Sequence, residues 1–293
     1  MTEYNNPAPE TREFDPPLVE CILCGSGHLR PFDRDFMGVA IVACHGCGLR
    51  FMNPQYSDAD LARYYGSGGY VEHISSATDV EAEERGGKQD NLDIVRRFVD
   101  SGRFLGVGCG NGTELWLARD MGYQTEGLDV DPQVAQRISQ SLDIPCHCGD
   151  LLTQDLPEGG YSVVYLDQVL EHLKNPSAIL ARIDRLLAPG GVLYLGLPNV
   201  GGWSNRYKTL IGRLGLKRRR GRHYDTYHHI AYFRPKVVAD WLEQELGYRT
   251  ELLEGAPPHD AHPILGSLER RLRSGSTFRG VFRKPRGQPS QSE

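Results

Sequence analysis

The stretch that decides the fold is Arg103-Phe-Leu-Gly-Val-Gly-Cys-Gly-Asn-Gly112. A short apolar segment in it runs into glycines at alternate positions, and the next residues, 113–121, have a helical pattern. Glycine lets the backbone turn tightly and approach a ligand, because no Cβ stands in the way. The first turn of a helix offers free amides to such a ligand. The sequence therefore predicts a strand, a nucleotide-type binding loop and a helix.

The glycine spacing excludes two common nucleotide sites. A dinucleotide loop needs G-x-G-x-x-G, but the position of the third glycine holds Asn111 in one frame and Thr113 in the other. The chain also has no G-x-x-x-x-G-K-[ST] run, which excludes a P-loop. Residues 124–128 are typical of a second strand, and Asp129 at its end can accept hydrogen bonds from two ribose hydroxyls.

The rest of the pattern alternates between strands and helices. Further strands are expected at 144–148, 161–167 and 192–197, the last preceded by a helix that ends in a glycine stop within Leu186–Gly191. A helix is expected at 235–246, and an antiparallel hairpin at 248–253 and 277–284. This order predicts an α/β fold.

Over about residues 90–255 the chain resembles the class I S-adenosylmethionine (SAM) dependent methyltransferases. The first motif of that family is met by Gly108, Gly110 and Gly112, and the phrases Leu170-Glu-His172 and Ala188-Pro-Gly-Gly191 also match. The resemblance implies a Rossmann-like α/β sheet of seven strands, mostly parallel, with an antiparallel C-terminal hairpin. Gly106 departs from the family, which usually has an acid there.

The resemblance also implies where SAM binds, with Asp150 facing the adenine. The expected cofactor-binding residues are Gly106, Gly108, Cys109, Gly110, Asn111, Gly112, Asp129, Val130, Asp150, Leu151, Asp167 and Gln168. The missing acid at position 106 leaves open a second interpretation, a SAM-binding scaffold that has lost most of its activity.

Four of the seven cysteines form two close pairs. Cys21 and Cys24 are separated by nineteen residues from Cys44 and Cys47, a spacing typical of a four-thiolate zinc ribbon. Four thiolates complete a tetrahedron, so the expected zinc is structural. The alternatives are two reduced cysteine pairs without metal, or two disulfides, which a cytosolic compartment disfavours. The remaining cysteines, Cys109, Cys146 and Cys148, are expected in the core or in loops. The sequence contains no C-x-x-x-C-x-x-C motif, so an iron–sulfur cluster is not expected.

Composition sets the domain organisation. The chain has 293 residues, 39% hydrophobic content and a net charge of −5, and no apolar run approaches the ~20 residues of a membrane span. The first twenty residues show no signal-peptide pattern, so a cytoplasmic protein without a membrane partner is expected. The predicted segments are a tail and zinc ribbon at 1–56, a helical linker or lid at 57–90, a methyltransferase domain at 91–286, and a disordered tail at 287–293.

Two segments are candidates for covering the site. An insertion at 200–230 lies where open α/β sheets bind ligands, and it contains the basic run 217–222, which suits substrate phosphates, nucleic acid or solvent. The tyrosines at 64, 65 and 70 either cover the cofactor or pack the ribbon against the main domain.

Histidines are the first candidates for catalysis, because an alcohol acceptor must lose its proton during methyl transfer. In the resembled family the regions of His172 and of His228 and His229 border the acceptor. Asp167 and Glu171 are further candidates, either as bases or, as in quinone-type members, as ligands of a divalent ion. Gln168 replaces an acid seen in those members, which argues against a metal requirement.

The preferred prediction is O-methylation of a small molecule such as a sugar, a sugar nucleotide or a natural-product intermediate, with a histidine base. The acceptor can carry phosphate, since the insertion is basic. The alternative enzyme is an RNA methyltransferase that uses the ribbon and the basic loop.

Overall fold

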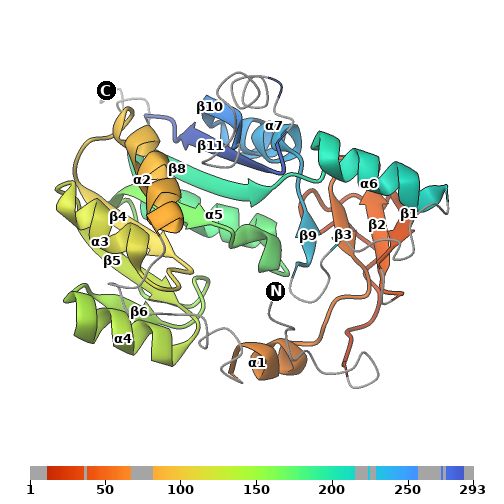
Figure 1. Ribbon diagram of the computed structural model, residues 1–293, viewed down its shortest axis with the longest axis horizontal. Coiled ribbons are helices and arrows are strands. Elements are labelled where there is room, and N and C mark those ends of the chain that lie inside the picture. The colour runs from red at the N-terminus through yellow and green to blue at the C-terminus, as the bar shows by residue number, and fades with distance from the viewer. Residues whose placement is uncertain are drawn as a thin grey trace, which may run out of the picture.

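The computed structural model describes residues 12–35, 38–66, 82–214, 224, 229–256, 272 and 275–286. Its larger sheet has seven strands in the order β10-β11-β8-β7-β4-β5-β6 (Figure 1). Neighbours pair in parallel from β8 to β6, and β11 pairs antiparallel with both β8 and β10. The predicted fold class is therefore confirmed. The strands are β4 (Arg103–Val107), β5 (Gln124–Asp129), β6 (Cys146–Cys148), β7 (Tyr161–Asp167), β8 (Leu187–Pro198), β10 (Arg249–Ala256) and β11 (Thr277–Arg283).

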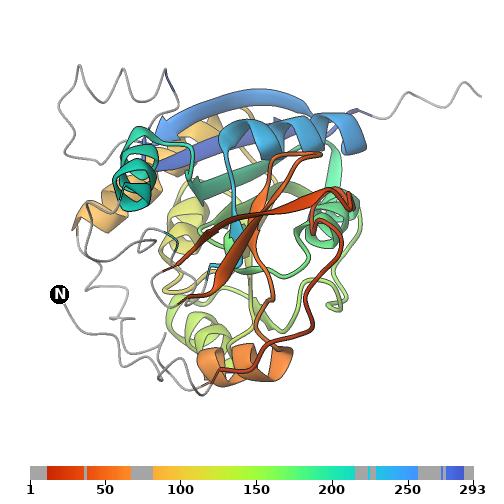
Figure 2. The ribbon, with the colours of Figure 1, turned by 90° about the vertical axis from the view of Figure 1, so that its right-hand side faces the viewer.

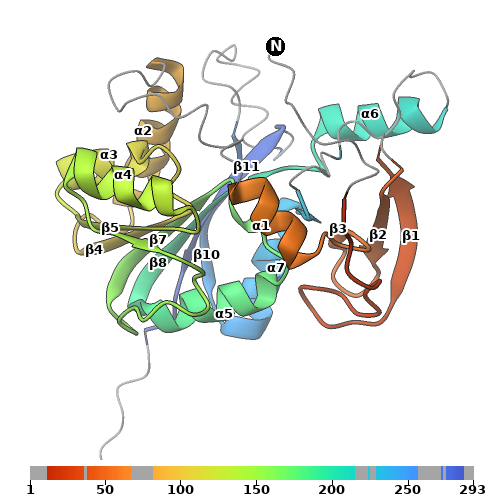
Figure 3. The same cartoon turned by 90° about the horizontal axis from the view of Figure 1, so that it is seen from below.

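Helices cover both faces of this sheet (Figures 1 and 3). One face carries α2 (Ala82–Arg96), α3 (Thr113–Asp120) and α4 (Pro132–Leu142), and the other carries α5 (Pro176–Leu186) and α7 (Pro235–Leu246). Buried leucines and isoleucines of the helices fill the two cores, Leu92, Leu115 and Ile138 on the first face and Ile183 and Leu242 on the second.

Local capping fixes where two of these helices begin. The carboxylate of Asp131 accepts a hydrogen bond from the amide of Gln133 before α4, and the side chain of Asn175 accepts one from Ala178 before α5. Both helices have proline in the first turn, where its missing N–H costs nothing.

The boundary before β8 differs from the prediction. The helix α5 ends at Leu186, but Leu187–Gly191 already belong to the strand, so the expected glycine stop lies inside β8. Leu187 pairs with Tyr161, and the register then shifts before Val163. The residues between Leu187 and Val192, which include both glycines, therefore form an irregularity within the strand and do not end the helix.

A second, smaller sheet contains a strand from the far end of the chain. It has the order β1-β2-β3-β9, formed by β1 (Leu29–Arg34), β2 (Ala40–Cys44), β3 (Arg50–Met52) and β9 (Ala231–Tyr232) (Figure 2). β9 pairs antiparallel with β3, with Arg50 opposite Tyr232 and Phe51 opposite Ala231. The ribbon sheet is thus completed by residues that follow the insertion.

Two helices lie outside the main layers. α1 (Asp58–Gly66) begins where Ser57 Oγ accepts a hydrogen bond from the Asp60 amide at 3.1 Å. α6 (Trp203–Arg213) follows β8 and lies beside the ribbon sheet (Figures 1 and 3). No described helix combines the length and the apolar character that a bilayer crossing requires.

Several predicted features fall outside the described residues. They are Tyr70, the basic run 217–222, His228 and the tail 287–293. The side chains of Tyr64 and Tyr65 are likewise not described, so both alternatives for them, covering the cofactor or packing the ribbon against the main domain, remain predictions.

Candidate active site

The glycine loop adopts the backbone conformation that its sequence predicts. Gly108 and Gly112 have φ angles of 65° and 76°, values that residues with a Cβ rarely adopt. The amide of Gly108 donates to the carbonyl of Leu128 at 2.8 Å, which ties the loop to the neighbouring strand β5. The loop therefore brings bare backbone to the carboxyl end of the sheet, where α/β folds bind their ligands.

Asp129 lies against this loop. Its Oδ2 accepts a hydrogen bond from the Gly110 amide at 3.2 Å, and its Oδ1 accepts one from the Asp131 amide at 3.0 Å. Burial raises the pKa of Asp129, and these amide contacts oppose the rise. The next side chain, Val130, is 55% exposed. An acid fixed beside the glycines and followed by an exposed apolar side chain suits a ribose and an adjoining base.

Other predicted cofactor residues have local structural roles. Asn111 Oδ1 accepts from the Thr113 amide at 3.1 Å, and Asp150 Oδ1 accepts from the Leu152 amide at 2.8 Å. Leu151 is buried. Cys109 is buried as well, with its sulfur 3.6 Å from that of Cys146, which agrees with the predicted core position of Cys109. These side chains shape the loops around the site.

Asp167, at the end of β7, is held by α2. Lys88 Nζ lies 3.1 Å from Asp167 Oδ2 and 3.7 Å from Glu114 Oε2, and Asn91 Nδ2 donates to Asp167 Oδ2 at 3.3 Å. Burial lowers the pKa of Lys88, but the two carboxylates outweigh it and raise the pKa overall. Gln168 follows with a φ of 58°, an uncommon value for a residue with a side chain.

Lys88 and Glu114 were not predicted from the sequence. Lys88 and Asn91 are three residues apart on one helix, a spacing that places both side chains on the same face. The spacing indicates that Lys88 and Asn91 act from the same side of the helix. It does not indicate which strand of the sheet that side contacts.

A second group of titratable side chains lies beyond β7. Glu171 and His172 belong to a short 3₁₀ helix, Leu170–His172, and His229 precedes β9. Ligand atoms of the three residues lie within 4.8 Å of one another, and the two imidazole rings are 4.9 Å apart between centroids. The Ile230 amide donates to the Glu171 carbonyl at 2.8 Å, which joins the two segments. The structure thus brings together two of the predicted histidines.

Glu171 is unusual for a carboxyl group. It is 1% exposed, and neither of its side-chain oxygens has a hydrogen-bond partner among the described residues. His172 Nε2 lies 4.0 Å from Glu171 Oε1. Burial, with a smaller contribution from Asp167, raises the pKa of Glu171 to about 8. A buried carboxyl group that has no hydrogen-bond partner among the described residues and has a raised pKa is typical of functional sites.

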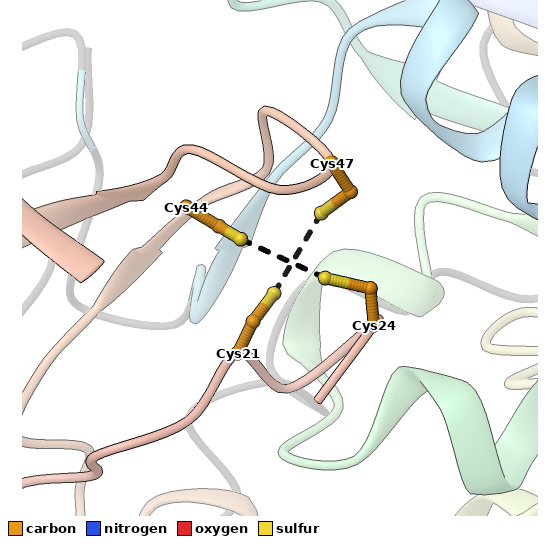
Figure 4. A group of neighbouring side chains, drawn as sticks. All are labelled: Cys21, Cys24, Cys44 and Cys47. Atoms are coloured by element: carbon orange, nitrogen blue, oxygen red, sulfur yellow. Dashed lines mark hydrogen bonds between the residues drawn. The ribbon is translucent and has the colours of Figure 1, made fainter. Parts of the chain in front are cut away.

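The four predicted cysteines converge in the ribbon (Figure 4). The sulfur of Cys21 is 3.7 Å from that of Cys47, and the sulfur of Cys24 is 3.6 Å from that of Cys44. All four sulfurs lie within 4.8 Å of one another. Zn–S bonds of about 2.3 Å in a tetrahedron give sulfur separations of about 3.8 Å, so the donor set fits zinc. The thiol–thiol contact with Cys47 lowers the pKa of Cys21 to about 5.

Comparison with known proteins identifies the family. Residues 82–252, more than half of the chain, match the methyltransferase domain family. The chain is a class I SAM-dependent methyltransferase family member. The matched methyltransferase region includes the glycine loop, Asp129, Asp167 and the Glu171–His172–His229 cluster.

Two curated relatives share part of the methyltransferase sequence. A ubiquinone biosynthesis O-methyltransferase of Xanthomonas oryzae is 27% identical over 161 residues, which cover 52% of this chain and 65% of that protein. An uncharacterised 37.1 kDa protein in transposon TN4556 of Streptomyces fradiae is 32% identical over 102 residues, or 32% of this chain and 30% of that protein. The chain therefore spans less than two thirds of either relative.

A solved methyltransferase structure shares the fold. The 1,6-didemethyltoxoflavin-N1-methyltransferase of Burkholderia thailandensis, solved with S-adenosylhomocysteine, has a TM-score of 0.55 at 14% identity. The likeness covers 87% of this chain and 99% of that structure. At this identity the comparison establishes the methyltransferase architecture and not the acceptor.

Proposed function

We propose that this chain transfers the methyl group of SAM to a hydroxyl oxygen of a small molecule, such as a sugar, a sugar nucleotide or a natural-product intermediate. The observation that carries the proposal is the cluster of Glu171, His172 and His229. It places two imidazoles and a buried carboxyl group beyond the end of β7, the strand next to the glycine loop strand β4.

SAM, when bound, supplies a methyl group on a positively charged sulfur. The glycine loop, Asp129 and Val130 provide its proposed binding surface at the ends of β4 and β5. Much of the rate of such a transfer comes from holding the acceptor oxygen in line with the methyl carbon and sulfur. An alcohol oxygen must also lose a proton as the new C–O bond forms and the C–S bond breaks.

The cluster can take up that proton. An imidazole of His172 or His229 accepts it. Above about pH 8, where Glu171 has lost its own proton, the carboxylate balances the positive charge that results. This balance is strong because Glu171 is buried, where charges are poorly screened. The name of the Xanthomonas relative, an O-methyltransferase, supports oxygen as the acceptor atom.

We further propose that the four cysteines bind one structural zinc ion. The sulfur separations support this assignment, and four thiolates leave no open position for a substrate. The role of the metal is then to hold the loops that flank β1 and β2.

The test is transfer of a radiolabelled methyl group from SAM to a panel of hydroxylated sugars, sugar nucleotides and phenols. Once an acceptor is found, His172→Ala and His229→Ala are compared with the wild type for kcat and for SAM affinity by calorimetry. We expect at least one variant to lose about a hundredfold in kcat, within the range for a lost general base, while SAM affinity stays within about threefold.

The matched control is His28→Ala, because His28 is exposed in the ribbon and far in sequence from the cluster. Full activity of both cluster variants would exclude a histidine base. Loss of activity with a chelator that leaves the zinc content of the ribbon unchanged, and its recovery with a divalent ion other than zinc, would instead assign the cluster to a metal. Methylation of nitrogen or carbon acceptors alone would exclude the O-methylation proposal.

A further inference from the structure

Helix α6 presents its apolar side chains to solvent. Trp203, Tyr207, Leu210 and Leu214 are 69%, 64%, 57% and 63% exposed. They are spaced i, i+4, i+7 and i+11, which places them in one stripe along the helix and its last turn. We call these four residues the α6 stripe. A surface helix of a globular protein usually has the opposite arrangement.

The polar side of the same helix faces the protein. Asn205 Nδ2 donates to the carbonyl of Asn199 at 2.8 Å, and Thr209 is hydrogen-bonded to the buried Tyr224. Tyr224 packs in turn against Phe32 and Tyr232 of the ribbon sheet. The orientation of α6 is therefore fixed by polar contacts, and these contacts keep the stripe outside the core.

The charged residues of α6 and of the segment that follows it are all basic. The α6 sequence contains Arg206, Lys208 and Arg213 and no acidic residue. The absence of acids continues in the sequence through residue 222, and residues 217–222 add five more basic residues. This is a strong local bias in a chain whose net charge is −5. The partner of the stripe is expected to carry negative charge next to an apolar phase.

We propose that the α6 stripe binds the surface of a bilayer that contains anionic lipids. A helix with Trp and Leu on one side and Lys or Arg elsewhere lies in the lipid interface, with the aromatic rings at the level of the headgroups. Nearby basic residues add an electrostatic attraction to anionic headgroups. The phosphates of a nucleic acid could bind the basic residues, but a nucleic acid has no apolar interior in which Leu210 and Leu214 could be buried.

This surface does not depend on the proposed methyl transfer. It departs from the expectation of no membrane partner, which rested on the lack of a spanning segment. A helix lying on the surface needs only one apolar side.

The experiment is co-sedimentation of the full chain with vesicles of phosphatidylcholine, with and without phosphatidylglycerol. We expect binding to the anionic vesicles that weakens with added salt, and little binding to phosphatidylcholine alone. The variant Trp203→Asp/Leu210→Asp should bind at least about tenfold more weakly, because it removes two apolar groups from the interface. The control is Val19→Asp, which changes an 80% exposed apolar residue in the ribbon and should bind like the wild type.

A fluorescence measurement covers the case in which the double variant fails to fold. Brominated lipids should quench the wild-type emission, and Trp203→Phe should lose most of that quenching while Trp116 and Trp241 remain. The proposal is overturned if the wild type ignores anionic vesicles, or if both variants behave like the wild type. It is also overturned if the stripe instead drives self-association or the binding of a homopolymeric RNA without vesicle binding. SAM titration of each variant keeps these outcomes separate from failure of the methyltransferase proposal.

Discussion

Leu115 of α3 occupies the space next to Gly106, the position at which the family usually has an acid. A Cβ built on Gly106 would lie 2.5 Å from Cδ2 of Leu115. A Cβ on Gly127, which pairs with Gly106 across β4 and β5, would lie 2.8 Å from Cδ1 of the same leucine. Two adjacent glycines thus accommodate one buried leucine, which leaves no room for a larger side chain at position 106.

Restoring the acid alone should therefore fail. We expect Gly106→Asp to lower the free energy of unfolding by about 1–3 kcal/mol, the usual cost of overpacking a core, and to leave SAM affinity no better than in the wild type. Gly106→Asp should cost less stability in a Leu115→Ala background than in the wild type, because the clash is absent there. Thermal melting and calorimetric titration with SAM and S-adenosylhomocysteine measure both effects. Tighter SAM binding by the single variant, with unchanged melting, would contradict this account.

Asp129 should matter for both the cofactor and the loop. Asp129→Asn keeps the shape of the side chain but removes its charge, so it should weaken the contacts with two backbone amides and the proposed contact with the ribose hydroxyls. Hydrogen bonds to charged groups contribute about 1.5–3 kcal/mol, so we expect the Kd for SAM to rise at least about tenfold. Calorimetry measures the change. Asp143→Asn is the control, because Asp143 ends α4 in a left-handed conformation that asparagine also tolerates.

Loss of one thiolate should unfold the ribbon. Cys44 is buried within the cysteine cluster, and Cys44→Ser should lower the zinc content well below one ion per chain and lower the melting temperature. Cys148→Ser should do neither, since Cys148 is exposed and lies outside the cluster. Metal analysis by mass spectrometry, together with thermal melting, tests this. A wild-type protein that is stable and free of zinc would refute the structural-zinc proposal.

Glu171 should make stability depend on pH. Its pKa rises from the ordinary 4.5 to about 8 on folding, so between these values the folded chain holds a proton that the unfolded chain has lost. The stability from this group is therefore present at low pH and falls by about 1.4 kcal/mol per pH unit as pH rises through that window. Glu171→Gln has no proton to lose at this position, so its free energy of unfolding should not fall in this window. Relative to the wild type, the variant should therefore become steadily more stable up to about pH 8, and the difference should stay constant above that pH. Denaturant titrations at several pH values test this, and parallel curves throughout would show that Glu171 keeps its ordinary pKa.

The elements that could be predicted from the sequence are those with local signals. Helix α7 was expected at 235–246 and has those bounds, because a proline begins it and Gly247 ends it in a left-handed conformation. The strand, glycine loop and helix from Arg103 to Asp120 follow from alternating glycines and an apolar run. The convergence of the four cysteines follows from their spacing alone.

Contacts between distant segments were not accessible in the same way. The pairing of β3 with β9 consists of two residue pairs whose members are about 180 residues apart in the sequence. No sequence pattern in either segment indicates that it pairs with the other. Lys88 reaches Asp167 only because α2 packs on the sheet at that position. The isolation of Glu171 depends equally on what surrounds it, so its raised pKa could not be inferred from its place in the Leu-Glu-His phrase.

The strand β9 also determines how this protein can be cut or recombined. The fourth strand of the ribbon sheet is formed by residues 231–232. The ribbon is therefore not an independent N-terminal module that can be exchanged alone. A truncation that removed the first 56 residues would leave β9 without its neighbour, only two residues beyond His229. Grafting this ribbon onto another methyltransferase would need both ends of the interleaved sheet to be transplanted together.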